Sequence, residues 1–109
     1  MACRGEYMLV TTACPDKASA KELARLLVEE RLAACVQLMP IESVYSWKGE
    51  IHDENEVLLL IKTKSVLYER LQSLIWRNHS YEVPEIIQLP ITGGLQAYMK
   101  WIDENTGDK

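Results

Sequence analysis

A chain of 109 residues lies in the usual range of a single domain, so one compact unit covering residues 1–109 with one apolar core is expected. Hydrophobic residues make up 48% of the chain and charged residues 26%, which argues against disorder and against a coiled-coil rod. The net charge of -4 gives no attraction for phosphate backbones or anionic lipid, so nucleic-acid and membrane-surface partners are not expected.

The ends of the chain and its cysteines bear on its compartment. No apolar run approaches the roughly 20 residues that span a bilayer, and the start from Met1 to Glu6 has no signal-peptide core. Cys3, Cys14 and Cys35 are an odd number and show neither a CxxC pair nor the Cys/His spacing of a structural zinc site. We therefore expect a cytoplasmic chain without a disulfide framework.

The first predicted elements are a strand and an amphipathic helix. Residues Tyr7 to Ala13 form a short apolar, β-prone run that Pro15 ends. Asp16 can accept the first free N–H groups of a following helix as its N-cap. From Lys17 to Leu32, apolar residues recur at i, i+3, i+4 and i+7, which predicts a helix with one buried face.

Two further strands are predicted to form a long hairpin. The second strand covers Ala33 to Met39, is interrupted at Pro40 by an expected bend or bulge, and resumes from Ile41 to Trp47. The pair Lys48-Gly49 suits a tight two-residue turn. The third strand ends in the apolar run Val57 to Ile61, which is typical of a strand covered on both faces or lying centrally in a sheet.

A second helix and a fourth strand follow. Ser65 is expected to cap the helix, which runs to about Asn78-His79, and Pro84 excludes its continuation. The fourth strand is predicted from Glu85 to Leu89 and is broken by Pro90. 

A last short helix is predicted from Leu95 to Asn105, and the tail from Thr106 to Lys109 is expected to be frayed. The order is βαβ followed by βαβ and a terminal helix. Two such units predict an α+β, ferredoxin-like fold, in which helices cover one face of an antiparallel sheet.

Several short motifs, spaced along nearly the whole chain, carry a family resemblance. The run Ala33-Ala34-Cys35-Val36-Gln37, then Pro40, then Ser43 to Ile51 resembles the AAC…P…S.Y.W.G.I stretch of the CutA divalent-ion tolerance family. The similarity continues through Thr12, Pro15-Asp16, Glu56-Val57, Lys62-Thr63, His79-x-Tyr81-x-x-Pro84-Glu85 and Tyr98-Met99-x-Trp101.

The resemblance implies a ferredoxin-like subunit in a tight homotrimer, similar in build to the PII signalling proteins. It also implies a role in tolerance of copper and other divalent metals. A trimer agrees with the hairpin itself, because an overlong hairpin carrying Tyr45 and Trp47 would otherwise expose an apolar sheet edge.

Metal ligands are also implied by the resemblance. Some members place a thiol at the end of strand 1 and adjacent histidines at the end of helix 2, a set suited to copper(II). In this sequence Thr12 takes the thiol position, with Cys14 two residues further on, and Asn78 takes the first histidine position. His79 is retained, and Cys35 matches the cysteine of the signature. The candidate ligands are therefore His79, Cys14 and Cys35.

Each candidate ligand has a simpler interpretation. His79 also suits a surface or interface histidine at a helix end, where the helix dipole favours it. Cys14 also suits a thiol of somewhat enhanced reactivity near a helix N-terminus. Cys35 also suits a buried strand residue.

Aromatic and charged residues of the hairpin suggest a second kind of site. Tyr45, Trp47, Glu56, Lys62 and Tyr81 could line a small-ligand cleft shared between subunits, which would suit a PII-like sensor or interaction module. Their alternative role is a trimer interface stabilised by aromatic packing and an ion pair. An enzyme is not expected, because Lys62 is accompanied by no pairing of nucleophile and base.

Overall fold

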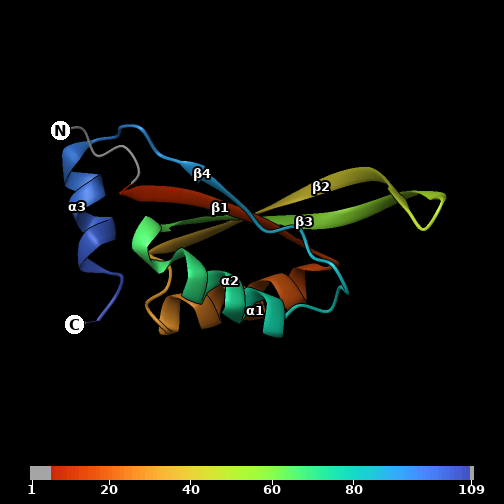
Figure 1. Ribbon diagram of the computed structural model, residues 1–109, viewed down its shortest axis with the longest axis horizontal. Helices are drawn as coiled ribbons and strands as arrows, with labels where there is room; N and C mark the ends of the chain where they lie inside the picture. Colours follow the sequence, from red (N-terminus) through yellow and green to blue (C-terminus); the bar gives the residue numbers. More distant parts are fainter. Residues whose placement is uncertain (1–5, 109) are drawn as a thin grey trace.

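The computed structural model describes residues 6–108, so Cys3 and the start on which the signal-peptide expectation rests lie outside the described residues. Within them the chain is α+β, with a four-stranded antiparallel sheet in the order β2-β3-β1-β4 (Figure 1). The elements are β1 (Tyr7–Cys14), α1 (Lys17–Glu29), β2 (Cys35–Trp47), β3 (Glu50–Lys64), the 3-10 turn η1 (Ser65–Leu67), α2 (Tyr68–Arg77), β4 (Ile87–Pro90) and α3 (Gln96–Glu104). The predicted fold class and element order are confirmed.

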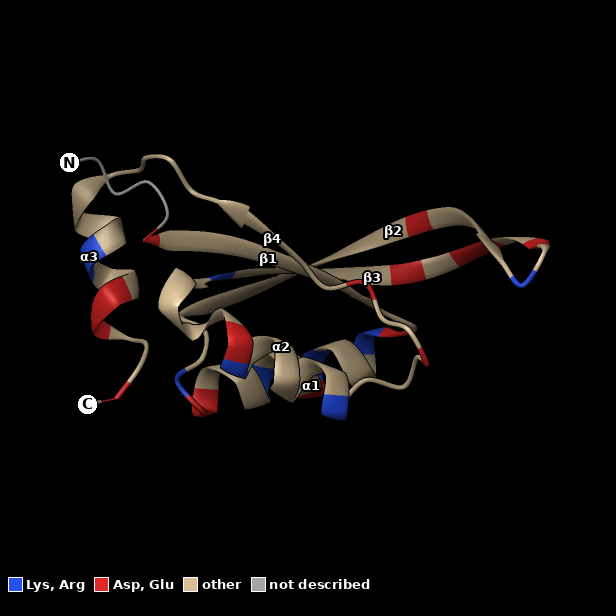
Figure 2. Cartoon of the chain, viewed as in Figure 1, with Lys and Arg blue, Asp and Glu red and all other residues tan. Residues whose placement is uncertain are grey.

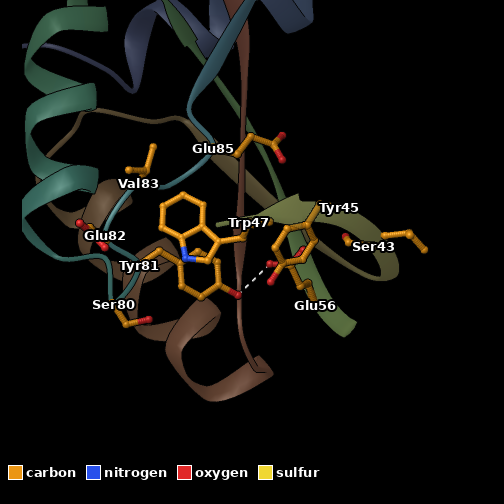
Figure 3. A pocket seen from close by; sticks show the side chains of 11 residues that line it. Ser43, Tyr45, Trp47, Glu56, Ser80, Tyr81, Glu82, Val83 and Glu85 are labelled. Atoms are coloured by element: carbon orange, nitrogen blue, oxygen red, sulfur yellow. Dashed lines mark hydrogen bonds between the residues drawn. The ribbon is translucent and has the colours of Figure 1, made fainter. Parts of the chain in front are cut away.

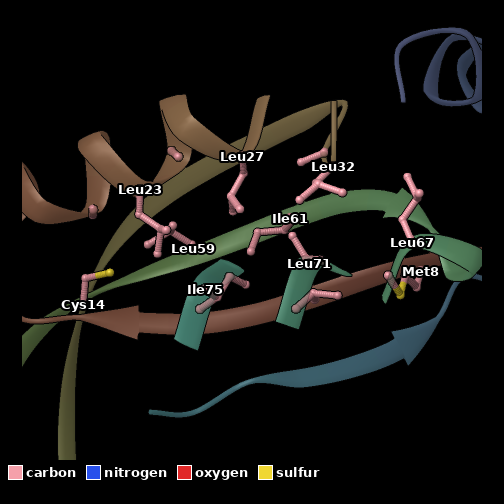
Figure 4. Close-up of a cluster of buried hydrophobic side chains, with 14 residues drawn as sticks. Met8, Cys14, Leu23, Leu27, Leu32, Leu59, Ile61, Leu67, Leu71 and Ile75 are labelled. Atoms are coloured by element: carbon pink, nitrogen blue, oxygen red, sulfur yellow. The ribbon is translucent and has the colours of Figure 1, made fainter. Parts of the chain in front are cut away.

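The main core lies between one face of the sheet and the helices α1 and α2 (Figure 4). The side chains alternate along β1, so Met8 and Val10 are fully buried against the helices, and so is Ile61 of β3. The predicted cap of α1 is confirmed, since Asp16 Oδ1 accepts from the Ser19 N–H at 2.8 Å. Every helix within residues 6–108 is too short or too polar to cross a membrane.

The third helix lies at one end of the sheet, away from α1 and α2 (Figure 1). Met99 and Ile102 of α3 pack against Ala34, with Tyr7 and Ile91 beside them. This small second cluster holds α3 at the end where β1 begins and β2 begins.

The residues after α3 are attached to the fold. Thr106 is 2% exposed, and its hydroxyl donates to the carbonyl of Ile102 at 2.8 Å. The N–H of Gly107 donates to the carbonyl of Arg31 at 2.8 Å, and Arg31 Nε donates back to the carbonyl of Gly107 at 2.6 Å. The expectation of a frayed tail is therefore wrong for Thr106 and Gly107.

The hairpin of β2 and β3 extends far beyond the rest of the sheet. Its pairing runs from Cys35 and Lys62 to Trp47 and Glu50, whereas β1 pairs with β3 only from Val57 to Lys64. Residues 41–56 therefore project as a two-stranded ribbon, which we call the arm (Figure 1). A two-stranded ribbon is marginally stable alone in water.

The predicted turn at the tip of the hairpin is confirmed, whereas the predicted interruption in its middle is not. Lys48 and Gly49 have φ angles of 52° and 82°, as a tight turn with two positive φ angles requires. Pro40 does not interrupt the ladder, because it stands opposite Val57 in an unbroken register. The predicted interruption and bulge are wrong, because β2 is an edge strand, where a missing N–H is tolerated.

Two other boundaries differ from the prediction. Ser65 does not cap α2, because it opens the 3-10 turn η1, and its N–H donates to the carbonyl of Glu6 at 2.9 Å. The fourth strand begins at Ile87 and includes Pro90. Glu85 lies before the strand, and its carboxylate accepts from the Thr11 hydroxyl at 3.0 Å.

The face of the sheet turned away from α1 and α2 carries several apolar side chains, and we call it the open face. In the strand register Leu9 of β1 stands beside Leu89 of β4, and Met39 of β2 stands beside Leu58 of β3. Met39 is 46% exposed and Leu89 is 44% exposed. Contiguous apolar surface of this kind marks an interaction site.

Candidate functional site

A cleft of about 620 Å³ lies at the base of the arm, where the loop after α2 passes the end of β1 (Figure 3). We call it the aromatic cleft. It is lined by Ala13, Ser43, Val44, Tyr45, Trp47, Glu56, Ser80, Tyr81, Glu82, Val83 and Glu85. The structure thus brings together Tyr45, Trp47, Glu56 and Tyr81, as the sequence predicted.

The aromatic walls of the cleft are fixed by carboxylates. The Tyr81 hydroxyl donates to Glu56 Oε2 at 2.7 Å, and Glu56 is 8% exposed. The Tyr45 hydroxyl donates to Glu54 Oε1 at 2.6 Å, across the diagonal between β2 and β3. Both tyrosines are therefore oriented by acceptors on the same strand.

These contacts keep the tyrosines in their neutral form. Burial raises the pKa of Tyr81 well above its usual value, and the hydrogen bond to the Glu56 carboxylate raises it further. The hydrogen bond to Glu54 raises the pKa of Tyr45 to about 12, with smaller contributions from desolvation and from the charges of Glu54 and Glu56. At neutral pH both phenols are donors, because a phenolate beside a carboxylate is unfavourable.

Tyr81 reaches Glu56 because His79 holds the loop after α2. His79 Nε2 lies 2.8 Å from the carbonyl oxygen of Ala13, and the Tyr81 N–H donates to His79 Nδ1 at 3.1 Å. A carbonyl can only accept, so the proton is on Nε2 and the ring is the neutral tautomer. Both ring nitrogens of this predicted metal ligand are therefore engaged in hydrogen bonds.

Lys62 does not line the aromatic cleft of the single chain, so its place in a cleft shared between subunits stays a prediction. It lies six residues from Glu56 along β3, which is roughly 20 Å at about 3.3 Å per residue. Its Nζ instead sits 5.6 Å from the ring centroid of Tyr98. Cys35 stands opposite Lys62 in the register, as a partly buried free thiol on the open face.

Cys14 and His79 line one groove of about 650 Å³ beside the start of α1 and the end of α2. Cys14 is 3% exposed. Burial raises the pKa of its thiol to about 11, and the charges of Asp16 and Glu56 raise it further in the same direction. The expectation of enhanced reactivity near the helix N-terminus is therefore wrong.

The three predicted metal ligands are not brought together. Cys14 and His79 share the groove, while Cys35 lies on the other side of the sheet. Within residues 6–108, no three side chains of the His, Cys, Asp and Glu types converge as a metal site. A single chain thus supplies two donors to one groove, a buried free thiol and an imidazole whose two ring nitrogens are hydrogen-bonded.

Native Cys14 is expected to react slowly with iodoacetamide. At pH 8, a pKa of about 11 in place of 9.0 lowers the thiolate fraction about 100-fold. Alkylation time courses read by peptide mass spectrometry should show this against the same thiol in urea. Equal rates in both conditions would contradict the raised pKa of the native thiol.

The same shift in pKa affects stability. Because the native state holds the proton more tightly, this thiol stabilises the fold below about pH 9 and loses that contribution as the pH rises through about 11.

Sequence reasoning missed several carboxylates at the cleft. Glu54 does not line the cleft but orients Tyr45, and it lies two residues from Glu56 on β3, so the period of a strand could have placed both on one face. Glu82 and Glu85 lie in the loop before β4, and no local pattern indicates that they line the cleft.

The chain is similar to known proteins over nearly its whole length. The family model described as CutA1 divalent ion tolerance protein matches residues 8–105. The chain is 45% identical to a zebrafish (Danio rerio) protein named Protein CutA homolog, over 95% of this chain and 70% of that protein. It is 44% identical to the divalent-cation tolerance protein CutA of Thermus thermophilus, over 94% of this chain and 98% of that protein.

A solved structure of the stable protein CutA1 from the psychrotrophic bacterium Shewanella sp. SIB1 superposes with a TM-score of 0.92 at 40% sequence identity. The match covers 96% of this chain and 99% of that one. Some relatives are much longer, since the chain spans only 55% to 58% of three of the curated proteins it matches.

Proposed function

The chain belongs to the CutA1 divalent ion tolerance family, and from that premise we propose that it is a homotrimer that binds copper(II) weakly and acts without catalysis. The observation that carries the metal proposal is the groove shared by Cys14 and His79. A thiol and an imidazole are donors that copper prefers. Cytoplasmic action stays a prediction of the sequence.

Copper binding at this groove has a cost that explains why it would be weak. The metal must displace a hydrogen-bond partner of the His79 ring, the Ala13 carbonyl or the Tyr81 N–H, and it must remove the proton of the buried Cys14 thiol. Affinity is therefore expected to rise with pH as protons are released. Cys35 faces the other side of the sheet and would serve only a metal held between subunits.

Calorimetric titration with Cu(II) under argon tests the proposal, with Zn(II) as a redox-inert comparison. His79→Gln keeps a donor for the Ala13 carbonyl but removes the imidazole, and Cys14→Ser removes the thiol. Each is expected to weaken copper binding about tenfold or more. His52→Gln, on the arm and outside the groove, is the matched control and should bind as the parent does. Identical isotherms for His79→Gln and the parent would remove His79 from the site.

The trimer is supported by two features of the single chain. The open face exposes apolar side chains, among them Met39 and Leu89. The arm projects as a two-stranded ribbon that needs a neighbour to be stable. Pairing with neighbouring subunits would cover both surfaces.

A second candidate function is favoured by the aromatic cleft. A cavity of about 620 Å³ with aromatic walls and a few polar groups lies in the usual size range of small-ligand sites. The arm forms one wall of the cleft. A neighbouring subunit that packs against the arm could therefore close the cleft. We propose as the alternative a small-molecule sensor or interaction module in which this cleft binds the ligand.

A further inference from the structure

The aromatic cleft has a lining of one charge sign. Glu56, Glu82 and Glu85 contribute carboxylates, and no lysine or arginine is among the described residues that line it. The arm beside it carries Glu42, Glu50, Asp53, Glu54 and Glu56 against the single Lys48 at its tip (Figure 2). A ligand that enters this cleft therefore meets a negative field.

Glu56 is the buried part of that charge. It is 8% exposed, and within the described residues its carboxylate has one hydrogen-bond donor, the Tyr81 hydroxyl, and no cationic partner. A buried carboxylate without a cation is costly, because burial removes water that one neutral hydrogen bond does not replace. A cation bound in the cleft would offset this cost.

The walls of the cleft suit an organic cation better than a metal ion. Tyr45, Trp47 and Tyr81 present aromatic rings around the same cavity (Figure 3). Ring faces attract ammonium groups but do not ligate metals as carboxylates do. The carboxylates do not converge either, since no three metal-binding side chains come together within residues 6–108.

The Trp47 ring already lies close to a cation. Lys48 Nζ, next along the chain, sits 5.7 Å from the ring centroid of Trp47. Lys48 itself is not among the residues that line the cleft. Trp47 therefore lines the cleft while its neighbouring lysine does not, which leaves the cleft without a cation from this lysine.

We propose that the aromatic cleft binds a small free organic cation, an ammonium group carried on an apolar body, between the rings of Tyr45, Trp47 and Tyr81 and the carboxylate of Glu56. The proposal rests on the alternative function, that this cleft binds a small molecule. The cleft is a different site from the copper groove, because neither Cys14 nor His79 lines it.

The test uses choline and its neutral isostere 3,3-dimethylbutan-1-ol, which differ in charge and hardly in shape. Calorimetric titration of the full chain should find choline bound about tenfold more tightly than the isostere. Glu56→Gln, which keeps an acceptor for Tyr81, should weaken choline binding about tenfold. Glu42→Gln makes the same charge change outside the cleft lining and should leave choline binding within about twofold.

Other outcomes overturn the inference. Equal binding of choline and the isostere, or no effect of Glu56→Gln, would show that charge does not select the ligand. Choline that binds only after Lys48→Gln would show that the lysine of the chain, or of a second copy, is the occupant.

A thermal-shift screen of nucleotides and small anions separates the small-molecule sensor function from the organic-cation proposal. If one of these stabilises the protein and choline does not, the sensor function stands and the organic cation fails; if nothing binds, both fail.

Discussion

Leu89→Glu is expected to convert the proposed trimer into monomers while leaving the subunit folded. Leu89 lies on the edge strand β4, opposite Leu9 on the open face, and is 44% exposed in the single chain. In a monomer a glutamate at this position stays in water, so the fold should lose less than about 0.5 kcal/mol. In a trimer assembled through this face, each copy would bury an unpaired carboxylate at a cost of several kcal/mol.

Sedimentation at micromolar concentration measures this result, and circular dichroism checks the fold. Gln88→Glu is the matched control, because it makes the same charge change one residue away, on the opposite side of β4. This control should remain a trimer. A Leu89→Glu variant that sediments like the parent would show that the open face is not the interface, and a parent that is a monomer would end the trimer proposal.

Ile61→Ala is expected to lower the free energy of unfolding by about 2–5 kcal/mol. Ile61 is fully buried at the centre of the core, between β1 and β2 in the sheet and beneath α1 and α2. The lost side chain leaves a cavity that the surrounding strands and helices cannot close. Urea unfolding at one fixed protein concentration measures the change, because association and folding are coupled in an oligomer.

Leu60→Ala is the comparison for this core prediction. Leu60 is next to Ile61 on β3 but lies on the open face and is only partly buried in the single chain. Its truncation should weaken association more than it weakens the subunit. Both truncations can be compared in the Leu89→Glu variant, which is expected to be a monomer. If Leu60→Ala and Ile61→Ala lower its free energy of unfolding equally, the separation of the two faces is contradicted.

The fold could be predicted where the determining signal is local. The apolar period of α1, its cap at Asp16 and the turn at Lys48-Gly49 each depend on neighbours in the sequence. Pro40 could not be interpreted in this way, because its effect depends on whether β2 is an edge strand. Sheet order is set by strands far away in the chain.

The candidate site shows the same division. Tyr45, Trp47 and Glu56 all lie on one hairpin, and the sequence placed them together. Lys62 shares a strand face with Glu56 but lies roughly 20 Å along the strand. The two-residue period of a strand therefore predicts which face a residue is on, but not which residues of that face lie close together. The role of His79 depends on the carbonyl of Ala13, whose position beside it only the folded chain reveals.

The hydrogen bonds of His79 connect the two proposed sites. Its ring joins the carbonyl of Ala13 to the backbone of Tyr81, and Tyr81 in turn holds Glu56. A copper ion on Nδ1 would displace the Tyr81 N–H, and one on Nε2 would move the ring proton to Nδ1, which could then no longer accept from Tyr81. Either position would loosen a wall of the cleft. Occupancy of the groove and of the cleft would then be antagonistic, and thermodynamic linkage requires each ligand to weaken the other by the same factor.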